Sequence, residues 1–341
     1  MIADMPVAAG AEETRRPLSG DTTVYFTDPG AQQAGAFRGG PDEALAHAID
    51  QARLSVDVAA HQLNLWSIRD ALLSAHHRGV KVRMVVESDY LEEPEIQQLK
   101  EAGIPVLGDR RESLMHNKFV ILDRMEVWTG SMNFTINDAY RNDNNLICLR
   151  SALLAENYSV EFNEMFEQDL FGDATLALTP NPTFTMNGMP VEVYFSPDDG
   201  TSGEINRHIQ SAQESIHFLA FSFTSDELAG AIIDQAIAGV RVAGVLEASQ
   251  IYTSGSDYAL FRDSGLDVRL DGNPRNMHHK VIIIDSTTVI TGSYNFSANA
   301  EKRNDENTII IHNVEIAGLF MSEFERVYAI TQSDEIEGMA Q

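Results

Sequence analysis

Hydrophobic residues fall into short runs that alternate with longer amphipathic segments along most of the chain. A β-branched and aromatic run at 23–27 is followed by a helical pattern at 44–52, an apolar run at 55–60, a second helical pattern at 68–78 and an apolar run at 80–87. Short apolar runs of this kind are typical of strands, and apolar positions at helical spacing are typical of helices. Strands that alternate with helices predict an α/β layer architecture.

The same order of segments occurs twice in the chain. The run Thr23–Thr27 recurs as Glu192–Ser196, and the run from His116 to Asp123 recurs from His278 to Asp285. The runs at 119–122 and 281–284 are continuously apolar, as expected for central strands that are covered on both faces. We therefore predict two similar α/β domains, each with a mixed sheet between helices, related by approximate two-fold symmetry.

Composition sets the predicted boundaries. Residues 1–20 are rich in Ala, Glu and Gly without periodicity, so we expect a disordered tail or the remnant of a removed leader. The halves are predicted over 21–172 and 191–335, and each ends in an amphipathic helix, at 152–171 and 314–330. The three prolines and the glycine near the end of 173–190 indicate a linker.

Charge and apolar content narrow the class of protein. A chain of 341 residues with 43% apolar residues can bury an ample core. Its net charge of −27 repels nucleic acid and anionic membranes at long range, so a polyanionic substrate must be held locally. Since no apolar run approaches the roughly 18 residues of a membrane span, we expect no stable membrane insertion. We expect a soluble protein, either cytoplasmic or secreted after loss of a leader, and the single Cys148 is expected to pack as a small hydrophobe.

One set of polar residues occurs in both halves at the same spacing. The pattern is His, one residue, Lys, four residues, Asp, six residues, Gly-Ser, one residue, Asn. Alternate residues of a strand share a face, so each histidine projects beside its lysine. The members are His116, Lys118, Asp123, Ser131 and Asn133 in the first half, and His278, Lys280, Asp285, Ser293 and Asn295 in the second.

These residue types fit phosphoryl transfer without a metal. A lysine two residues from each histidine would repel a cation, and the third ligand that zinc requires is not at ligand spacing. Phosphoryl transfer needs positive charge and hydrogen-bond donors around the phosphate oxygens, which Lys, Ser and Asn side chains supply. One imidazole can act as nucleophile and a second as acid and base. We therefore expect no metal and no cofactor.

With Gly-Ser-x-Asn after each His-x-Lys-x4-Asp, the chain resembles the phospholipase D superfamily from about residue 22 onward. The resemblance implies a phosphohistidine intermediate on one histidine, acid–base catalysis by the other, phosphate binding by both lysines, and independence from metals. Members with a single copy are nucleases that dimerise to assemble one site. A chain with both copies is therefore expected to be active as a monomer, and its compact halves resemble the endonuclease-like branch.

The two halves differ at one position of interest. Nuclease-like relatives carry a glutamate downstream of the motif, which this chain has as Glu306 in the second half, whereas the first half has Asn144. A carboxylate hydrogen-bonded to an imidazole favours its charged form. We therefore hypothesise that His278 is the protonated acid and His116 the neutral nucleophile, with Glu306 part of the catalytic set. Asp123 and Asp285 belong to the family motif and are included in the predicted catalytic set, although aspartates that end strands also form turns.

Other polar and aromatic residues receive structural assignments. Glu87 and Glu247 correspond between the halves and are expected to end strands. A core role is favoured for Phe221 and Phe223, although they and Trp66 could flank a cleft. Histidines with no counterpart in the other half are expected on the surface or in packing; they are His61, His76, His77, His208 and His279.

The sequence leaves three classes of function open. Compact halves with short connections favour a nuclease that cleaves DNA or RNA, with a local basic rim from Arg110, Arg111, Arg141, Arg275 and Arg303. The first alternative is a phospholipase D or phosphatidyltransferase that acts on phospholipids. The second is a non-catalytic phosphate-binding protein with a relic site, although both halves keep every residue of the motif.

Overall fold

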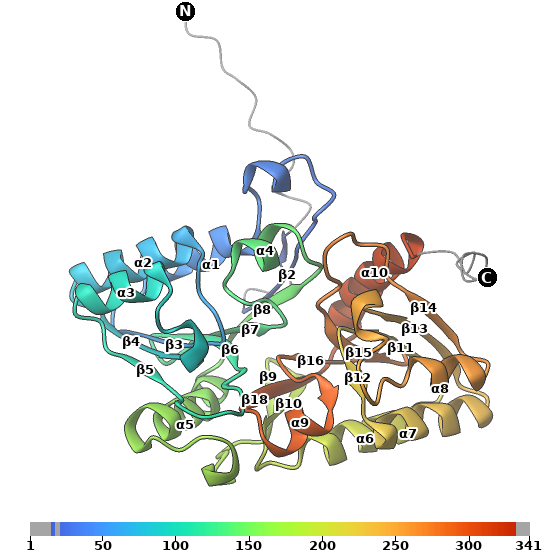
Figure 1. The fold of residues 1–341 in the computed structure, drawn as a ribbon. Coiled ribbons are helices and arrows are strands. Elements are labelled where there is room, and N and C mark those ends of the chain that lie inside the picture. Colours follow the sequence, from blue (N-terminus) through green and yellow to red (C-terminus); the bar gives the residue numbers. More distant parts are fainter. Residues whose placement is uncertain (1–14, 18–20, 332–341) are drawn as a thin grey trace, which may run out of the picture.

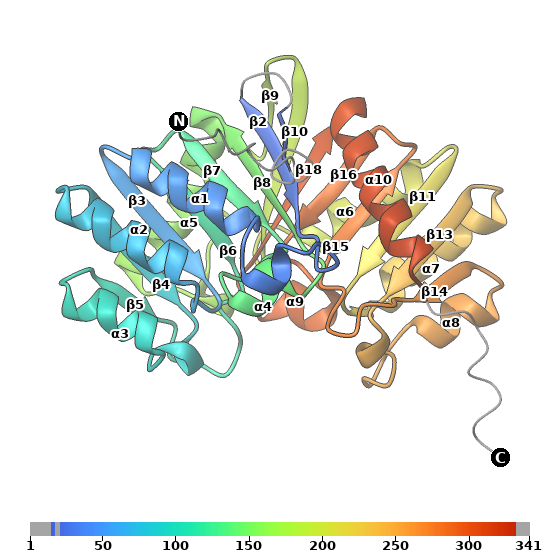
Figure 2. The same cartoon turned by 90° about the horizontal axis from the view of Figure 1, so that it is seen from above.

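The computed structural model describes residues 15–17 and 21–331, and its chain forms two similar α/β halves that pack against each other (Figures 1 and 2). Among the described residues, each half is built on one sheet of eight strands. The sheets are mixed, with parallel and antiparallel neighbours in both. This arrangement confirms the predicted fold class.

The sheet of the first half places the motif strand near its middle. The strand order is β1-β2-β8-β7-β6-β3-β4-β5. The strands are β1 (Arg15–Pro17), β2 (Thr22–Phe26), β3 (Ser55–Ala60), β4 (Lys81–Val86), β5 (Val106–Gly108), β6 (Lys118–Leu122), β7 (Glu126–Gly130) and β8 (Asn145–Arg150). Every residue of β6 is buried, as its continuous apolar run at 119–122 predicts, and every residue of β3 is buried as well.

The sheet of the second half repeats this arrangement. Its order is β14-β13-β11-β15-β16-β18-β10-β9, so β15 corresponds to β6. The strands are β9 (Thr183–Met186), β10 (Met189–Ser196), β11 (Ser215–Ala220), β13 (Arg241–Leu246), β14 (Asp267–Leu270), β15 (Lys280–Ile284), β16 (Thr288–Gly292) and β18 (Glu306–His312). A separate pair joins β12 (Phe223–Thr224) to β17 (Phe296–Ser297).

Helices cover both faces of each sheet. The outer faces carry α1 (Pro41–Gln51), α2 (Trp66–His77) and α3 (Pro94–Glu101) in the first half, and α6 (Thr201–Ser211), α7 (Asp226–Ile237) and α8 (Tyr258–Asp263) in the second. The inner faces carry the long helices α5 (Ala152–Gln168) and α10 (Val314–Ala329). Side chains cap both long helices, because Ser151 accepts the Leu154 N–H and Asn313 accepts the N–H groups of Glu315 and Ile316.

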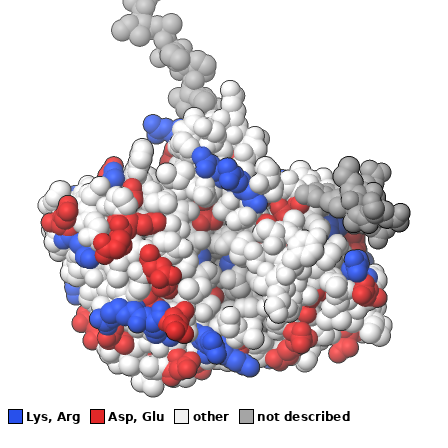
Figure 3. Space-filling model, in the orientation of Figure 1, with Lys and Arg blue, Asp and Glu red and all other residues white. Residues whose placement is uncertain are grey.

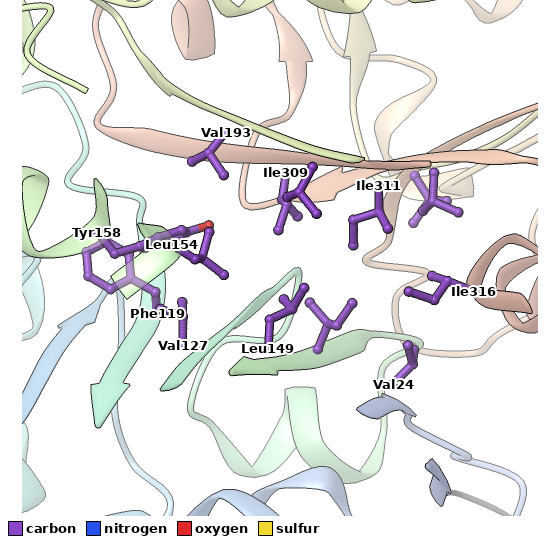
Figure 4. Close-up of a cluster of buried hydrophobic side chains, with 14 of the residues drawn as sticks. Val24, Phe119, Val127, Leu149, Leu154, Tyr158, Val193, Ile309, Ile311 and Ile316 are labelled. Atoms are coloured by element: carbon purple, nitrogen blue, oxygen red, sulfur yellow. The ribbon is translucent and has the colours of Figure 1, made fainter. Parts of the chain in front are cut away.

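The largest hydrophobic core belongs to both halves. Phe119, Val127 and Leu149 of the first sheet lie opposite Val193, Ile309 and Ile311 of the second (Figure 4). Two further cores lie under the outer helices, one in each half. Because this shared core is apolar and buried, it fixes the position of one half relative to the other. It thereby also fixes the sheet edges at which the two halves meet.

The predicted elements agree closely with the observed ones, apart from the linker and the amino-terminal segment. The 173–190 stretch contains β9 and the start of β10, which pair as an antiparallel hairpin. Most of the tail predicted at 1–20 lies outside the described residues, and Arg15–Pro17 pairs with β2. Within the described ranges, no helix combines the length and apolarity that a membrane crossing requires. Cys148 is half-buried against the outer core of the first half.

Candidate active site

The two motif histidines meet where the halves join, and each is held by backbone of the opposite half. The His116 N–H donates to the Asp305 carbonyl (N to O 2.9 Å), and the His278 N–H donates to the Asp143 carbonyl (2.8 Å). Short parallel bridges continue these contacts from Met115 to Asp305 and from Asp143 to Met277. The chain therefore forms one composite site rather than two separate half-sites.

The imidazoles are also paired across the halves. Nδ1 of His116 lies 2.7 Å from Glu306 Oε2, and Nδ1 of His278 lies 3.0 Å from Asn144 Oδ1. This contradicts the basis of the sequence hypothesis, which assigned the glutamate to the histidine of its own half. Glu306 of the second half contacts His116 of the first half. Asn144, which occupies the equivalent position in the first half, contacts His278 of the second half.

A second carboxylate, which the sequence analysis missed, lies beside His278. Asp138 is buried in the short helix α4 (Ile136–Tyr140), and its Oδ1 lies 3.5 Å from His278 Nδ1. The same oxygen accepts a hydrogen bond from Asn144 Nδ2 (2.9 Å). The equivalent position in α9 (Ala298–Lys302) is Ala300. The first half thus has Asp138 with Asn144 where the second half has Ala300 with Glu306.

Both motif lysines are buried beside their histidines. Lys118 Nζ donates to the His116 carbonyl (2.6 Å), and Lys280 Nζ donates to the His278 carbonyl (2.8 Å). Burial lowers the pKa of Lys118 to about 8, although the carboxylates of Glu306 and Asp138 oppose this shift. Burial and the charge of Lys118 lower the pKa of Lys280 well below its usual value. An anion bound beside these two amino groups favours their charged form, so the pair suits a phosphate group.

Burial also controls the protonation of the histidines. It lowers the pKa of His116 and of His278 well below 6.5, and the nearby lysines lower both further. A neutral His116 that donates Nδ1–H to Glu306 keeps the lone pair of Nε2 free. Burial raises the pKa of Glu306 to about 8, and the charges of Lys118 and Lys280 oppose this shift.

The Gly-Ser pairs position the residues that contact the histidines. Ser131 Oγ donates to Asn144 Oδ1 (2.9 Å), and Ser293 Oγ accepts the Asn307 N–H (3.0 Å), next to Glu306. Both serines are fully buried, as the motif lysines are, and their predicted role in substrate binding stays a prediction. The glycines are required because a Cβ at Gly130 or Gly292 would lie 2.4 or 2.2 Å from a carbonyl oxygen of the adjacent strand.

Asn133 and Asn295 have amide groups that the protein leaves partly unused. The Oδ1 atom of each is buried without a hydrogen-bond partner, in both halves alike. A buried carbonyl oxygen without a partner is costly in a folded protein. The repeated exception at equivalent positions fits amides held for a bound group, and they stay candidates for substrate binding.

Asp123 and Asp285 do not reach the site. Each follows its motif strand at the end opposite to the histidine, and each carboxylate accepts three successive backbone N–H groups. Those of Asp123 come from Arg53, Leu54 and Ser55, and those of Asp285 from Gln213, Glu214 and Ser215. We therefore correct the predicted catalytic role of both aspartates. They anchor the loop that leads into β3 or β11.

This correction gives a stability prediction. Replacing Asp123 by alanine is expected to lower the free energy of unfolding at pH 7 by about 2 kcal/mol, because charge-assisted hydrogen bonds to three N–H groups are lost. Although burial opposes it, these donors lower the pKa of Asp123 below 3.8. The stabilisation is thus present at neutral pH and is lost as the pH falls through that lowered pKa. Urea unfolding of wild type and Asp123→Ala at pH 7 and pH 3 measures this difference in stability. If folded Asp123→Ala lost most of its turnover, the purely structural role of Asp123 would be contradicted.

Several further residues frame the site. The carboxylates of Glu87 and Glu247 accept the N–H groups of Met115 and Met277 (2.8 and 2.7 Å), directly before the histidines. They therefore fix the loops that carry the histidines, in agreement with their structural assignment.

Two rings at equivalent positions line the histidines. The rings of His61 and His116 lie 4.8 Å apart, and those of Phe221 and His278 lie 4.7 Å apart. His61 was expected on the surface or in packing, and it packs against the motif histidine itself, so it borders the site directly. Its position after β3, which matches that of Phe221 after β11, was the available signal. Phe223 is in the core. Trp66 is exposed, and its Nε1–H donates a hydrogen bond to the Glu95 carboxylate.

A groove lies between the two halves, and Asp143 in its lining also accepts the His278 N–H through its carbonyl group. It has a volume of about 770 Å³, and its lining includes Phe37, Arg141, Asp143 and Arg275. Arg141 lies over the Phe37 ring at 5.5 Å. Of the arginines predicted to form a rim, Arg110 and Arg111 are paired with Asp169 and Asp305. Figure 3 shows basic and acidic side chains interspersed around a central hollow.

The family model described as "Cardiolipin synthase, PLD-like domain" matches residues 45–166 and 205–328. The chain belongs to this phospholipase D-like family. It is a phosphodiesterase of that superfamily, as the paired motifs predict.

Relatives of this phospholipase D-like protein cover parts of its chain. A phospholipase D of Rickettsia bellii is 33% identical over 159 residues, which cover 45% of this chain and 79% of the relative. Human mitochondrial cardiolipin hydrolase is 37% identical over 122 residues, 36% of this chain and 48% of the relative.

Solved structures give similar matches. Phosphatidylserine synthase of Haemophilus influenzae has a TM-score of 0.66 at 14% identity, covers 85% of this chain and 84% of its own, and supports the fold alone. The phospholipase D family member Nuc from Salmonella typhimurium is 32% identical over 42% of this chain and 97% of its own, with a TM-score of 0.41.

Proposed function

We propose that this chain cleaves phosphodiester bonds without a metal, through a phosphohistidine intermediate, at one site that a single polypeptide completes. The crossed pairing carries this proposal, because each motif histidine takes its Nδ1 partner from the other half. Both halves lie in one chain, so a monomer supplies both imidazoles, both lysines and both partners. Gel filtration with activity assayed across the peak tests the monomeric state.

His116 is the proposed nucleophile. The Glu306 carboxylate orients its Nδ1–H, which leaves Nε2 free to attack phosphorus while the bond to the leaving oxygen breaks. The imidazole becomes cationic as the P–N bond forms, and the carboxylate at 2.7 Å stabilises that charge. The earlier assignment of His116 as nucleophile is thus kept, for a different reason.

His278 is the proposed acid and base. In the first step its Nε2–H protonates the leaving oxygen, and in the second its Nε2 takes a proton from the water that attacks phosphorus and breaks the P–N bond. Asn144 holds Nδ1 of this ring. Burial and the lysine charges lower the pKa of His278 in the free protein, and the negative charges of the bound phosphate and of Asp138 oppose that shift, so the ring is protonated when substrate is bound. Lys118 and Lys280 bind the phosphate oxygens in both steps.

Single-stranded nucleic acid is the substrate that the surroundings support best. The adjoining groove combines Arg141 and Arg275 with the half-exposed ring of Phe37. Cations along a groove and an aromatic face are the features by which proteins hold single strands. With a net charge of −27, such binding must be local and sensitive to salt.

Phospholipid is the second candidate, because the relatives named above are a phospholipase D and a cardiolipin hydrolase. The same phosphate-binding groups serve either substrate, so the substrate class must be measured. Only the groups beyond the phosphate differ, namely bases and sugars against acyl chains.

One assay separates these candidates. The full chain is incubated in excess EDTA with single-stranded DNA, duplex DNA, RNA, and micelles of phosphatidylcholine with cardiolipin. We expect cleavage of single-stranded nucleic acid, lost in His116→Ala and His278→Ala. Arg141→Ala and Arg275→Ala should raise KM, whereas the control Arg262→Ala on the outer helix α8 should not. Turnover of lipid alone would favour the second candidate, and activity abolished by EDTA would exclude the histidine mechanism.

The lysines predict an alkaline limit to activity. Lys118 is charged below its pKa of about 8 and neutral above it, so phosphate binding weakens as pH rises through that value. We expect kcat/KM to fall by about tenfold per pH unit above pH 8. A pH profile from 6 to 10 measures this, and constant kcat/KM up to pH 10 would show that the lysines stay charged.

A further inference from the structure

Three side chains that can bind a metal converge far along the second sheet from the motif residues. Glu192 lies on β10, His208 on α6, and His312 at the end of β18. Nε2 of His208 and Nε2 of His312 each lie 2.9 Å from Glu192 Oε1. The three atoms all lie within 4.8 Å of one another. His208 and Glu192 are 5% and 8% exposed, so the cluster is covered by α6.

The surrounding residues orient the three side chains toward a common point. Tyr194 Oη and Arg207 Nη2 both donate to Glu192 Oε2 (2.8 and 2.7 Å), which leaves Oε1 facing the imidazoles. The Thr288 hydroxyl lies 3.0 Å from Nδ1 of His312 and so fixes that ring with Nε2 inward. Protein metal sites use such outer hydrogen bonds to orient their ligands.

The first half provides an internal control. By the alignment of the two halves, Thr23, Ala48 and Arg150 occupy the positions of Glu192, His208 and His312. That half forms the same strands and the same helix without any of these groups. The fold therefore does not require two imidazoles and a carboxylate at this place.

Hydrogen bonding alone leaves the His208 ring in conflict. Its Nε2 lies 2.9 Å from the acceptor Glu192 Oε1 and 3.0 Å from the donor Arg207 Nη2. If Nε2 carries a proton, two donors face each other at the Arg207 guanidinium. If Nε2 carries no proton, two acceptors face each other at the Glu192 carboxylate. A cation between the three ligand atoms removes the conflict with the carboxylate. Arg207 has a side chain that is 54% exposed and can swing into solvent.

We propose that Glu192, His208 and His312 bind one Zn²⁺ ion in the second half, separate from the phosphodiester site. Two imidazole nitrogens with one carboxylate oxygen suit zinc, whereas Mg²⁺ and Ca²⁺ prefer oxygen ligands alone. Tetrahedral zinc with bonds of about 2.0–2.1 Å places its ligand atoms about 3.3 Å apart. The two distances of 2.9 Å from Glu192 Oε1 to the imidazoles therefore need to lengthen by only a few tenths of an ångström, and the two imidazole nitrogens already lie within 4.8 Å of each other. The ion ties α6 to β10 and β18 and so stabilises this half.

Calorimetry and thermal unfolding test the site on the full chain without a histidine tag, after dialysis against EDTA and then buffer. We expect one equivalent of ZnCl2 to bind and to raise Tm by about 5 °C at saturation, because the ion binds only the folded state. His312→Ala and Glu192→Gln should abolish both effects. His77→Ala, at the end of α2, is the matched control and should leave them unchanged.

Two milder variants keep the test decisive if the first pair folds poorly. Arg207→Ala removes the competing cation and should tighten zinc binding about tenfold, whereas Thr288→Val removes the contact to Nδ1 and should weaken it about tenfold. Absence of zinc binding by wild type, or binding that none of these variants changes, would overturn the proposal. Phosphodiesterase activity in EDTA is expected to stay intact, which separates this result from the outcome for the proposed function.

Discussion

Replacing His116 by alanine is expected to lower kcat by about 10⁴-fold, because the covalent step loses its nucleophile. His278→Ala should be nearly as slow on natural substrates, whose leaving oxygen needs a proton. The two variants should differ on a p-nitrophenyl phosphodiester, since p-nitrophenolate leaves without protonation. His278→Ala is then expected to release one equivalent of p-nitrophenolate in a rapid burst and to stop as the phosphohistidine. His116→Ala should give no burst.

Stopped-flow absorbance measures the burst, and mass spectrometry of the trapped protein locates the modified residue. A burst in His116→Ala with the label on His278 would reverse the assigned roles. If neither variant gave a burst, the proposal that His116 forms the covalent intermediate without proton transfer from His278 would be contradicted. Because both variants remove a buried imidazole, their thermal unfolding should be compared first.

Replacing Asp138 by alanine is expected to lower kcat by about 100-fold, because His278 then keeps only a neutral amide at Nδ1. The second half suggests a rescue. A chain with both Asp138→Ala and Asn144→Glu carries in its first half the alanine and glutamate that the second half has at 300 and 306. We expect this double variant to recover kcat to within about tenfold of wild type.

The comparison of single and double variants excludes a simple folding defect. Asp138 also accepts hydrogen bonds from Thr135 and Asn142, so its loss can loosen α4. Loosening would be at least as severe in the double variant, whereas a missing charge would be restored there. Wild-type turnover by Asp138→Ala, or no recovery in the double variant, would show that His278 does not depend on this carboxylate.

Local patterns in the sequence were sufficient for most of the fold. The run at 55–60 is β3 without any change of boundary, and the helix predicted at 152–171 is α5 shortened by its last turn. Strand and helix periods depend on neighbours in sequence, so they can be recognised along the chain. The hairpin of β9 and β10 was missed because its prolines and glycine are also the residues of linkers.

The site was predictable in its members but not in its pairing. The spacing identified both histidines and both lysines, because alternate strand residues share a face. It could not show that Glu306 reaches His116, since that contact depends on how two halves pack. Asp123 illustrates the same limit, because spacing does not tell which end of β6 meets the partner half. Asp138 was missed because it lies outside the repeated pattern.

The carboxylates near the two histidines also bear on how such a chain can change over time. In a homodimer, any substitution appears in both half-sites at once, so a glutamate lost from one is lost from the other. A fused chain can alter a single half, and here one half keeps Glu306 while the other has Asn144 with Asp138. Duplication thus gives each histidine an environment that can evolve independently, and in the mechanism we propose one environment serves bond formation to phosphorus and the other proton transfer.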